Sequence, residues 1–404
     1  MTLQLAIVSD QVLPTLIPAL MEPPEHLILL CSKRMRQTGQ GQRQKRVLQK
    51  HDVNAFLYET DFPDTSLGAI RDFALELAEW VEAHHAGQDL VLNATGGTKL
   101  MSLGLIEVFR DLAQGYGLRI IYTDTAHGRL EVLSDSARRS GFPDAIPMGN
   151  VLDVKKYLWA QGFRVQRSLA SEEEWRETAQ QRKQACKFLG TRAPDLEGLF
   201  GQLNWLAHQA HSENTHGVPS EADIRPVQLL PRPPRGPWAQ ALQHLERAGL
   251  IHWDGEKRIE FTSLDSIGFI KGGWLEEYVW HVVKDAGVND CLIGVEGVWD
   301  GSEAARNEFD VLACHRNQLL FVECKTLSFG AKPNENRPND NEIAYKLNSL
   351  GNEARGLFGE TWLVTARTPT QILKDRARQA RFEILGPPDL AKLKDRVQTW
   401  MGLH

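Results

Sequence analysis

Four charged residues, Glu308, Asp310, Glu323 and Lys325, border or interrupt two apolar runs in the C-terminal third of the chain. If the runs are strands, Glu308 and Asp310 share a face, and so do Glu323 and Lys325. Carboxylates gathered at the edge of an apolar sheet repel one another unless a divalent cation lies between them, and oxygen ligands suit Mg²⁺ or Mn²⁺. Such an ion lowers the pKa of bound water, while Lys325 would orient that water or hold a scissile phosphate.

The surrounding residues predict how these side chains are positioned. The apolar runs 309–314 and 319–324 flank the polar segment 315–318, a pattern that predicts two antiparallel strands joined by a hairpin turn. Whether the charged faces coincide depends on the register of the pair. The alternative interpretation is an ordinary amphipathic hairpin with its charges in solvent.

The composition is that of a folded globular protein. The chain has 404 residues, with 42% hydrophobic and 24% charged residues, which is enough for two or three domains with their own cores. The net charge of −6 gives no general basic field, so any contact with nucleic acid must be local.

The five cysteines show no CxxC spacing, which argues against a disulfide framework or a zinc site and for a reducing compartment. No basic leader precedes an apolar run, and no stretch approaches eighteen apolar residues. We therefore expect a cytoplasmic protein without a membrane partner.

Residues 1–148 alternate between apolar runs and segments with helical periodicity. This order predicts an α/β domain with a parallel, Rossmann-like sheet covered on both faces. The expected strands are 3–9, 26–31, 89–93 and 118–123, and the expected helices are 14–21, 67–84 and 102–113.

In such a sheet, ligands bind beyond the carboxyl ends of the strands. The segment 93–101 leaves a strand there and enters a helix. Gly96 and Gly97 would let the backbone approach a ligand, while Thr98 and Lys99 would donate to phosphate near a helix N-terminus. The candidate contacts are Asn93, Thr95, Gly96, Gly97, Thr98, Lys99 and Met101.

The middle region, 149–268, predicts helices and one small module. We expect helices at 151–161 and 171–188, the second with a capping box formed by Ser171 and Glu174. The proline-rich segment 217–236 is expected to be a loop or linker.

A helix at 237–249 followed by a hairpin at 250–261 resembles a winged-helix module. For this module we favour a structural packing role over DNA binding. Two other groups of residues receive no function: the basic segment 32–46 is expected to be a solvated loop, and His208, His211 and His216 are assigned no metal.

Asp310 followed by Glu323, Cys324 and Lys325 resembles the PD-(D/E)XK nuclease signature, although Phe309 stands where that signature has proline. The resemblance implies a C-terminal domain at 269–404 of α/β architecture and a cation held by Asp310, Glu323 and the backbone carbonyl of Cys324. It also implies a glutamate from an upstream helix.

That helix is expected to begin near residue 272. Its Trp274, Leu275 and Glu276 resemble the start of the corresponding helix in related domains, which favours Glu276 over Glu277. A solvent-exposed acidic pair is the alternative.

The segment 93–101 resembles the ligand loop of the CARF domain, the CRISPR-associated Rossmann fold that senses cyclic oligoadenylates. By this resemblance, further ligand contacts come from the loop after the first strand. They are Ser9, Asp10, Gln11, Pro14 and Thr15.

A CARF domain joined to a PD-(D/E)XK domain is similar to the Can and Card nucleases of type III CRISPR antiviral defence. The resemblance implies a homodimer activated by cyclic tetra-adenylate, with Mn²⁺ or Mg²⁺ as cofactor. The implied substrate is DNA, with RNA as a second candidate. Two rivals remain: a constitutive restriction or repair-type nuclease, and a ligand-responsive winged-helix transcription regulator.

Overall fold

The computed structural model describes residues 2–112, 117–125, 127–134, 141, 143–210, 224–302, 306–326, 343–345, 347, 351, 354, 356 and 359–403. Contacts divide the chain into two compact units, one of residues 1–163 with 356–358 and the other of 164–355 with 359–404. None of the helices in these described ranges is both long enough and apolar enough to cross a membrane.

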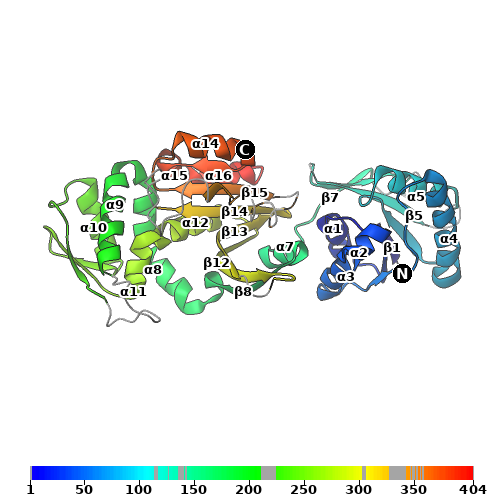
Figure 1. The fold of residues 1–404 in the computed structure, drawn as a ribbon, viewed down its shortest axis with the longest axis horizontal. Helices are drawn as coiled ribbons and strands as arrows, with labels where there is room; N and C mark the ends of the chain where they lie inside the picture. The colour runs from blue at the N-terminus through cyan, green and yellow to red at the C-terminus, as the bar shows by residue number, and fades with distance from the viewer. Residues whose placement is uncertain are drawn as a thin grey trace. The chain divides into compact units, whose positions relative to one another are not determined.

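The N-terminal unit, drawn in blue to cyan in Figure 1, is built on a seven-stranded sheet with the order β3-β2-β1-β4-β5-β6-β7. The first five strands in this order (β3, β2, β1, β4 and β5) are parallel to one another, and a parallel sheet is what the sequence predicts. Strands β6 and β7 run antiparallel. Strands β3, β6 and β7 were not predicted, because each is too short to be recognised by periodicity. The strands are β1 (Thr2–Ile7), β2 (His26–Leu30), β3 (Ala55–Leu57), β4 (Asp89–Asn93), β5 (Leu118–Asp124), β6 (Arg129–Val132) and β7 (Ala145–Pro147).

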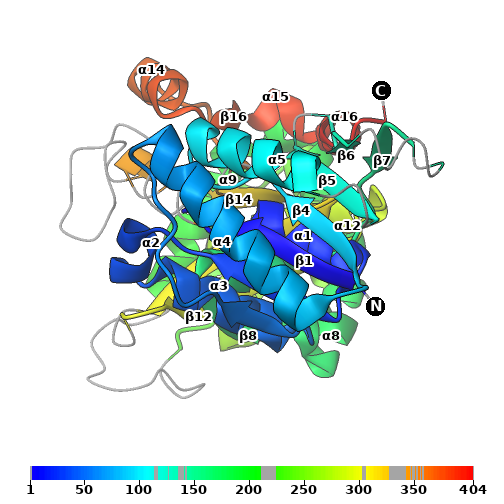
Figure 2. The ribbon, with the colours of Figure 1, turned by 90° about the vertical axis from the view of Figure 1, so that its right-hand side faces the viewer.

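Helices cover this sheet. On one face α4 (Leu67–His85) and α5 (Lys99–Leu112) lie side by side (Figure 2), and their apolar residues share a core with Leu5 and Ile7 of β1. The other helices of the unit are α1 (Leu13–Met21), α2 (Lys33–Gln37), α3 (Gln40–Lys50) and α7 (Val154–Gln161).

The prediction of a solvated loop at 32–46 was wrong, because α2 and α3 occupy it. The Ser32 hydroxyl caps α2 by accepting from the Met35 amide at 3.3 Å, and Gly39, with φ of 75°, allows the sharp turn into α3. Basic residues dominate the composition of this segment, so composition alone does not indicate that Met35 and Leu48 are buried.

The C-terminal unit contains a six-stranded sheet with the order β16-β15-β14-β13-β12-β8. The predicted hairpin is present: β13 and β14 pair antiparallel with Val311 opposite Val322. Arg316 and Asn317 form a two-residue turn with φ of 48° and 63°. The strands are β8 (Phe163–Ser168), β12 (Asp290–Trp299), β13 (Arg306–His315), β14 (Gln318–Lys325), β15 (Gly359–Thr365) and β16 (Glu383–Leu385).

Helices and a small second sheet complete this unit. The sheet, of order β10-β11-β9, contains the predicted hairpin of β10 (Ile251–Trp253) and β11 (Arg258–Phe261), and β9 (Val227–Leu229) adds a strand where only a loop was expected. The helices are α8 (Glu173–Thr191), α9 (Ala193–Ala210), α10 (Pro237–Arg247), α11 (Leu264–Gly268), α12 (Trp274–Asp285), α14 (Gln371–Ala380), α15 (Pro387–Leu390) and α16 (Leu393–Trp400).

The capping box expected at Ser171 is absent, because Ser171 ends a 3₁₀ turn and α8 begins two residues later. Glu172 takes the cap position without a side-chain hydrogen bond to the helix. Its carboxylate instead accepts from Arg167 at 2.6 Å. A residue outside the helix thus competes for the acidic side chain at the cap.

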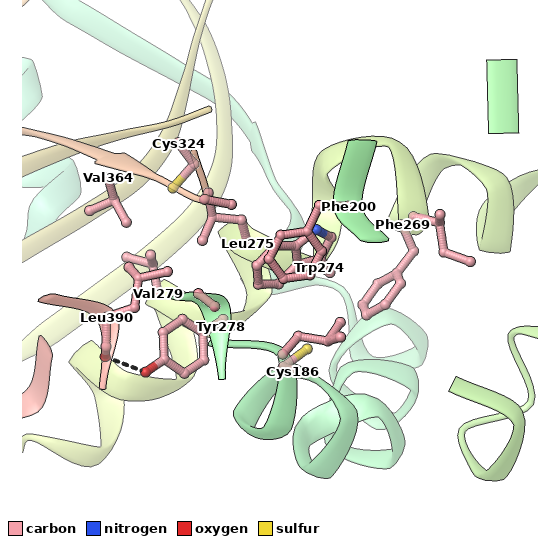
Figure 3. Close-up of a cluster of buried hydrophobic side chains, with 14 of the residues drawn as sticks. Cys186, Phe200, Phe269, Trp274, Leu275, Tyr278, Val279, Cys324, Val364 and Leu390 are labelled. Atoms are coloured by element: carbon pink, nitrogen blue, oxygen red, sulfur yellow. Dashed lines mark hydrogen bonds between the residues drawn. The ribbon is translucent and has the colours of Figure 1, made fainter. Parts of the chain in front are cut away.

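Helix α12 runs through the core of the C-terminal unit (Figure 3). Its Trp274 stacks on Phe200 of α9 with ring centroids 4.6 Å apart, and the Tyr278 hydroxyl donates to the Leu390 carbonyl at 2.6 Å. The same core receives the apolar faces of α10, β10 and β11, so the winged-helix-like module packs within this unit.

We predict that Gly190→Ala destabilises the C-terminal unit, because a Cβ at Gly190 would overlap the ring of Tyr278. Overpacking of this kind costs about 1–3 kcal/mol. Gly268→Ala is the control, since its added Cβ meets nothing within 4 Å and its backbone is helical. Thermal unfolding of the full chain tests this, and equal midpoints for the two variants would contradict it.

Candidate functional site

The hairpin places the two predicted acids across from each other. Extended by one residue, the register that pairs Val311 with Val322 sets Asp310 opposite Glu323. Both side chains are buried, with Glu323 only 1% exposed. The carboxylates therefore gather at one end of an apolar sheet, and the alternative of a hairpin with all its charges in solvent does not hold.

The ammonium of Lys325 lies beside these carboxylates. Its Nζ is 2.7 Å from Oε1 of Glu323 and 4.0 Å from Oδ2 of Asp310, which also accepts from the Cys324 amide at 2.6 Å. Burial alone would lower the pKa of Lys325, but the carboxylates of Asp310 and Glu323 raise it overall. The lysine is held as a cation and balances part of the local negative charge.

Adjacent glutamates on α12 have different surroundings. Glu277 is buried and accepts from Nη1 of Arg182 at 3.1 Å, and its second oxygen lies 3.9 Å from Sγ of Cys186. Arg182 also pairs with Asp265. Glu277 therefore belongs to an ion-pair network between α12 and α8.

Glu276 instead lies near the acids of the hairpin. Burial, reinforced by the Asp310 carboxylate, raises the pKa of Glu276 to about 8. Lys325 acts against this shift, while Glu308 and Glu323 add to it. Of the two glutamates, Glu276 is the one that faces the predicted site. Glu308 itself is exposed on β13.

A wide helical turn, Phe269–Gly273, precedes α12 and fixes its entry. The Trp274 amide donates to the Phe269 carbonyl, five residues back, which is π geometry. The Lys271 carbonyl in this turn accepts from Asn204 Nδ2 at 2.6 Å and from Thr326 Oγ1 at 2.8 Å. Because Thr326 follows Lys325 directly, these bonds join the start of α12 to the end of the acidic strand.

The hairpin and α12 bring Asp310, Glu323, Glu276 and Lys325 into one region. Within the described ranges, however, no three His, Cys, Asp or Glu side chains converge closely enough to form a finished cation site. The oxygen donors present are of the type that Mg²⁺ and Mn²⁺ prefer, and closely spaced buried carboxylates favour a cation electrostatically. The donor chemistry thus fits such an ion.

In the N-terminal unit, Asn93 ends β4 and organises the loop after it. Its Nδ2 donates to the Pro14 carbonyl at 2.9 Å, and its Oδ1 accepts from the Thr95 hydroxyl at 2.6 Å. Thr123, at the end of β5, bonds to both Thr95 and the Pro14 carbonyl. Asn93 is 1% exposed, so its place is in the scaffold of the loop.

Both glycines of this loop are required by its geometry. A Cβ on Gly96 would overlap the Ile7 carbonyl oxygen, and Gly97 has φ of 74°. Thr98 caps α5 by accepting from the Met101 amide at 3.3 Å, while Thr98 and Lys99 are exposed. A ligand at this helix N-terminus would meet the positive end of the helix dipole.

Hydrogen bonds from Asn93 and Thr123 to the Pro14 carbonyl hold the residues after β1 beside this segment. Ser9 and Gln11 bond to each other, and Gln44 of α3 donates to the Ser9 carbonyl at 2.8 Å. Asp10 is exposed, 3.6 Å from Arg34. The remaining predicted contacts Pro14, Thr15 and Met101 are buried.

Sequence reasoning missed the side chains that hold these loops. Gln44, Asn204 and Thr326 carry no motif, and their partners lie far along the chain. Several residues with sequence-based expectations fall outside the described ranges. They are the polar loop 333–341, predicted to lie near the acidic site, Lys346, predicted to face that site from a helix, and His211 with His216. His208 is a residue of α9.

Comparison with known proteins identifies both parts of the chain. Residues 3–157 match the family model described as the Card1 CARF domain, and residues 265–404 match the Card1-like endonuclease domain. No curated protein matches the sequence.

Two solved structures resemble the whole chain. The protein VC1899 from Vibrio cholerae is 22% identical with a TM-score of 0.79, covering 99% of this chain and 98% of that one. Can2 from Sulfobacillus thermosulfidooxidans, solved in complex with cyclic tetra-adenylate, is 23% identical with a TM-score of 0.71 and covers 99% of both chains. These likenesses establish a shared fold.

We predict that Glu277→Gln destabilises the chain and that Glu276→Gln does not. The first change leaves the buried guanidinium of Arg182 with the single carboxylate of Asp265, at a cost of about 1–3 kcal/mol, below that of breaking a buried pair completely. The second removes one of several repelling carboxylates. Urea unfolding measures both, and a larger loss for Glu276→Gln would refute the assignment.

Proposed function

Because this chain joins a CARF domain of the Card1 type to a Card1-like endonuclease domain, we propose that it is a metal-dependent nuclease switched on by cyclic tetra-adenylate. The observation that carries the proposal is the buried pair Asp310 and Glu323, with the Lys325 ammonium beside it, inside the endonuclease domain.

The proposed cation ligands are the carboxylates of Asp310, Glu323 and Glu276 and the backbone carbonyl of Cys324. A divalent cation bound by them would lower the pKa of water and stabilise charge on a phosphoryl oxygen. Glu308 is exposed beside this group and is proposed to assist.

Lys325 would position the attacking water or hold the scissile phosphate. Its ammonium is already fixed by Glu323, so little reorganisation is needed when a phosphate arrives. The burial of Asp310 and Glu323 strengthens these interactions, because charges act more strongly where water is excluded.

The activator site is proposed at the exposed part of the loop after β4. Gly97, Thr98 and Lys99 are exposed at the N-terminus of α5, which suits the phosphates of a cyclic oligoadenylate. The ligand of the solved Can2 complex supports cyclic tetra-adenylate. Gln11, Asp10 and Ser9, along with the scaffold residues behind them, are proposed to complete the site.

We propose that two copies of the chain share the activator. Leu100 and Leu103, three residues apart at the start of α5, are 45% and 60% exposed. They adjoin the proposed ligand loop, so a second copy would cover apolar surface next to the ligand. Activation would then be a population shift, with the ligand binding the active dimer more tightly.

We predict that plasmid DNA and labelled single-stranded RNA are cut only with Mn²⁺ and cyclic tetra-adenylate together, and that Glu323→Gln abolishes cutting. Agarose and denaturing gels measure both. Equal cutting without activator would favour a constitutive nuclease. Sequence-specific DNA binding without cutting, unaffected by Lys325→Met, would favour a regulator.

We further predict that Lys99→Ala raises the concentration of cyclic tetra-adenylate needed for half-maximal cutting by about tenfold or more. One charged hydrogen bond contributes about 1.5–3 kcal/mol. Lys50→Ala, an exposed change on α3, serves as control. An unchanged half-maximal concentration for Lys99→Ala would remove Lys99 from the ligand site.

A further inference from the structure

A cavity of about 480 Å³ lies between α14, β16 and the start of α15 in the C-terminal unit. Its volume falls in the range of small-ligand pockets. The side chains of Phe382, Ile384, Pro387 and Pro388 give it apolar walls, and Lys374 and Arg378 stand on the α14 side. None of these residues belongs to the acidic site or the ligand loop described above.

The register places this cavity at the same end of the sheet as the acidic site, beyond the carboxyl ends of the strands. Strands β14, β15 and β16 are parallel, with Lys325 beside Thr365 and Val364 beside Leu385. Gly386, which lines the cavity, therefore follows β16 at the level where Lys325 ends β14. Two strand spacings separate them, about 10 Å.

The charge at the cavity favours an anionic ligand. Lys374 and Arg378 are four residues apart and so share one face of α14. Arg378 pairs with Asp375 at 3.3 Å, but both are exposed, so this pair competes weakly with another anion. Asp389, the acid of the lining, has its Oδ2 engaged by the Gly386 amide at 2.8 Å.

We propose that this cavity is a substrate subsite that takes one unpaired base of a single-stranded nucleic acid, with Lys374 and Arg378 holding the adjoining phosphates. The proposal rests on the proposed nuclease function and adds a base-binding subsite to it. An apolar recess can receive a base only when that base is unstacked and unpaired, so a duplex would present phosphates alone. DNA and RNA share this chemistry.

The test separates the cations from the recess. Lys374→Ala/Arg378→Ala removes the charges, and Lys392→Ala/Lys394→Ala removes two exposed lysines outside the lining as a matched control. Gly386→Leu fills the recess: Gly386 has φ of −90°, and its added Cβ would make only ordinary contacts, the nearest at 3.5 Å. Gly386→Val is a smaller replacement should the leucine variant fail to fold.

Binding is measured in the full-length Glu323→Gln background, so that no substrate is consumed and the result does not depend on cutting. Fluorescein-labelled 20-nucleotide single-stranded DNA, single-stranded RNA and duplex DNA are titrated by anisotropy over a salt series, with cyclic tetra-adenylate present. If cutting fails in the unmutated protein while these binding differences persist, the subsite stands and the nuclease proposal falls.

The double alanine variant should lower the slope of log affinity against log salt by about 1.4 for single strands, since each phosphate contact contributes about 0.7. Gly386→Leu should weaken single-strand binding about tenfold, as expected for one base contact, without changing the slope or duplex binding. A larger loss of affinity for single-stranded RNA than for single-stranded DNA, or the reverse, would indicate which of the two is the natural substrate. Unchanged single-strand binding by the filled variants, or equal losses for single strands and duplex, would overturn the subsite.

Discussion

Charge neutralisation around one helix governs the C-terminal unit. Helix α12 carries two adjacent glutamates with different surroundings: Arg182 bonds to Glu277, while Glu276 lies near the Asp310 and Glu323 carboxylates, which Lys325 partly neutralises. A buried carboxylate without such a partner would cost several kcal/mol. The pairing of Glu277 with Arg182 and the aromatic packing of Trp274 and Tyr278 together hold the helix in one orientation.

Much of this arrangement could be predicted, because it depends on patterns of residues that are close together in the sequence. Alternation of strands and helices revealed the N-terminal sheet, and apolar runs around a polar turn revealed the hairpin with Asp310 and Glu323. The glycines of the ligand loop were recognisable because strand, turn and helix follow one another directly. Short elements such as β6, β8 and β9 escaped, since three to six residues carry too little periodicity.

The contacts that hold these sites could not be predicted. Asn204 reaches the Lys271 carbonyl from 67 residues away, and Arg182 reaches Glu277 from 95 residues away. Pairs of this kind depend on tertiary packing and leave no spacing to recognise. The same reason explains the error at 32–46, where burial of one apolar stripe outweighed a strongly basic composition.

The π turn before α12 determines the direction in which each side chain of α12 points around the helix axis. Each residue of an α-helix advances the side-chain direction by about 100°, and a wide turn takes up one residue without that advance. Closing Phe269–Gly273 to α geometry would turn α12 by that angle relative to α11. Leu275 would then take the direction of Glu276, so the bonds of Asn204 and Thr326 to one carbonyl select between an acidic and an apolar face.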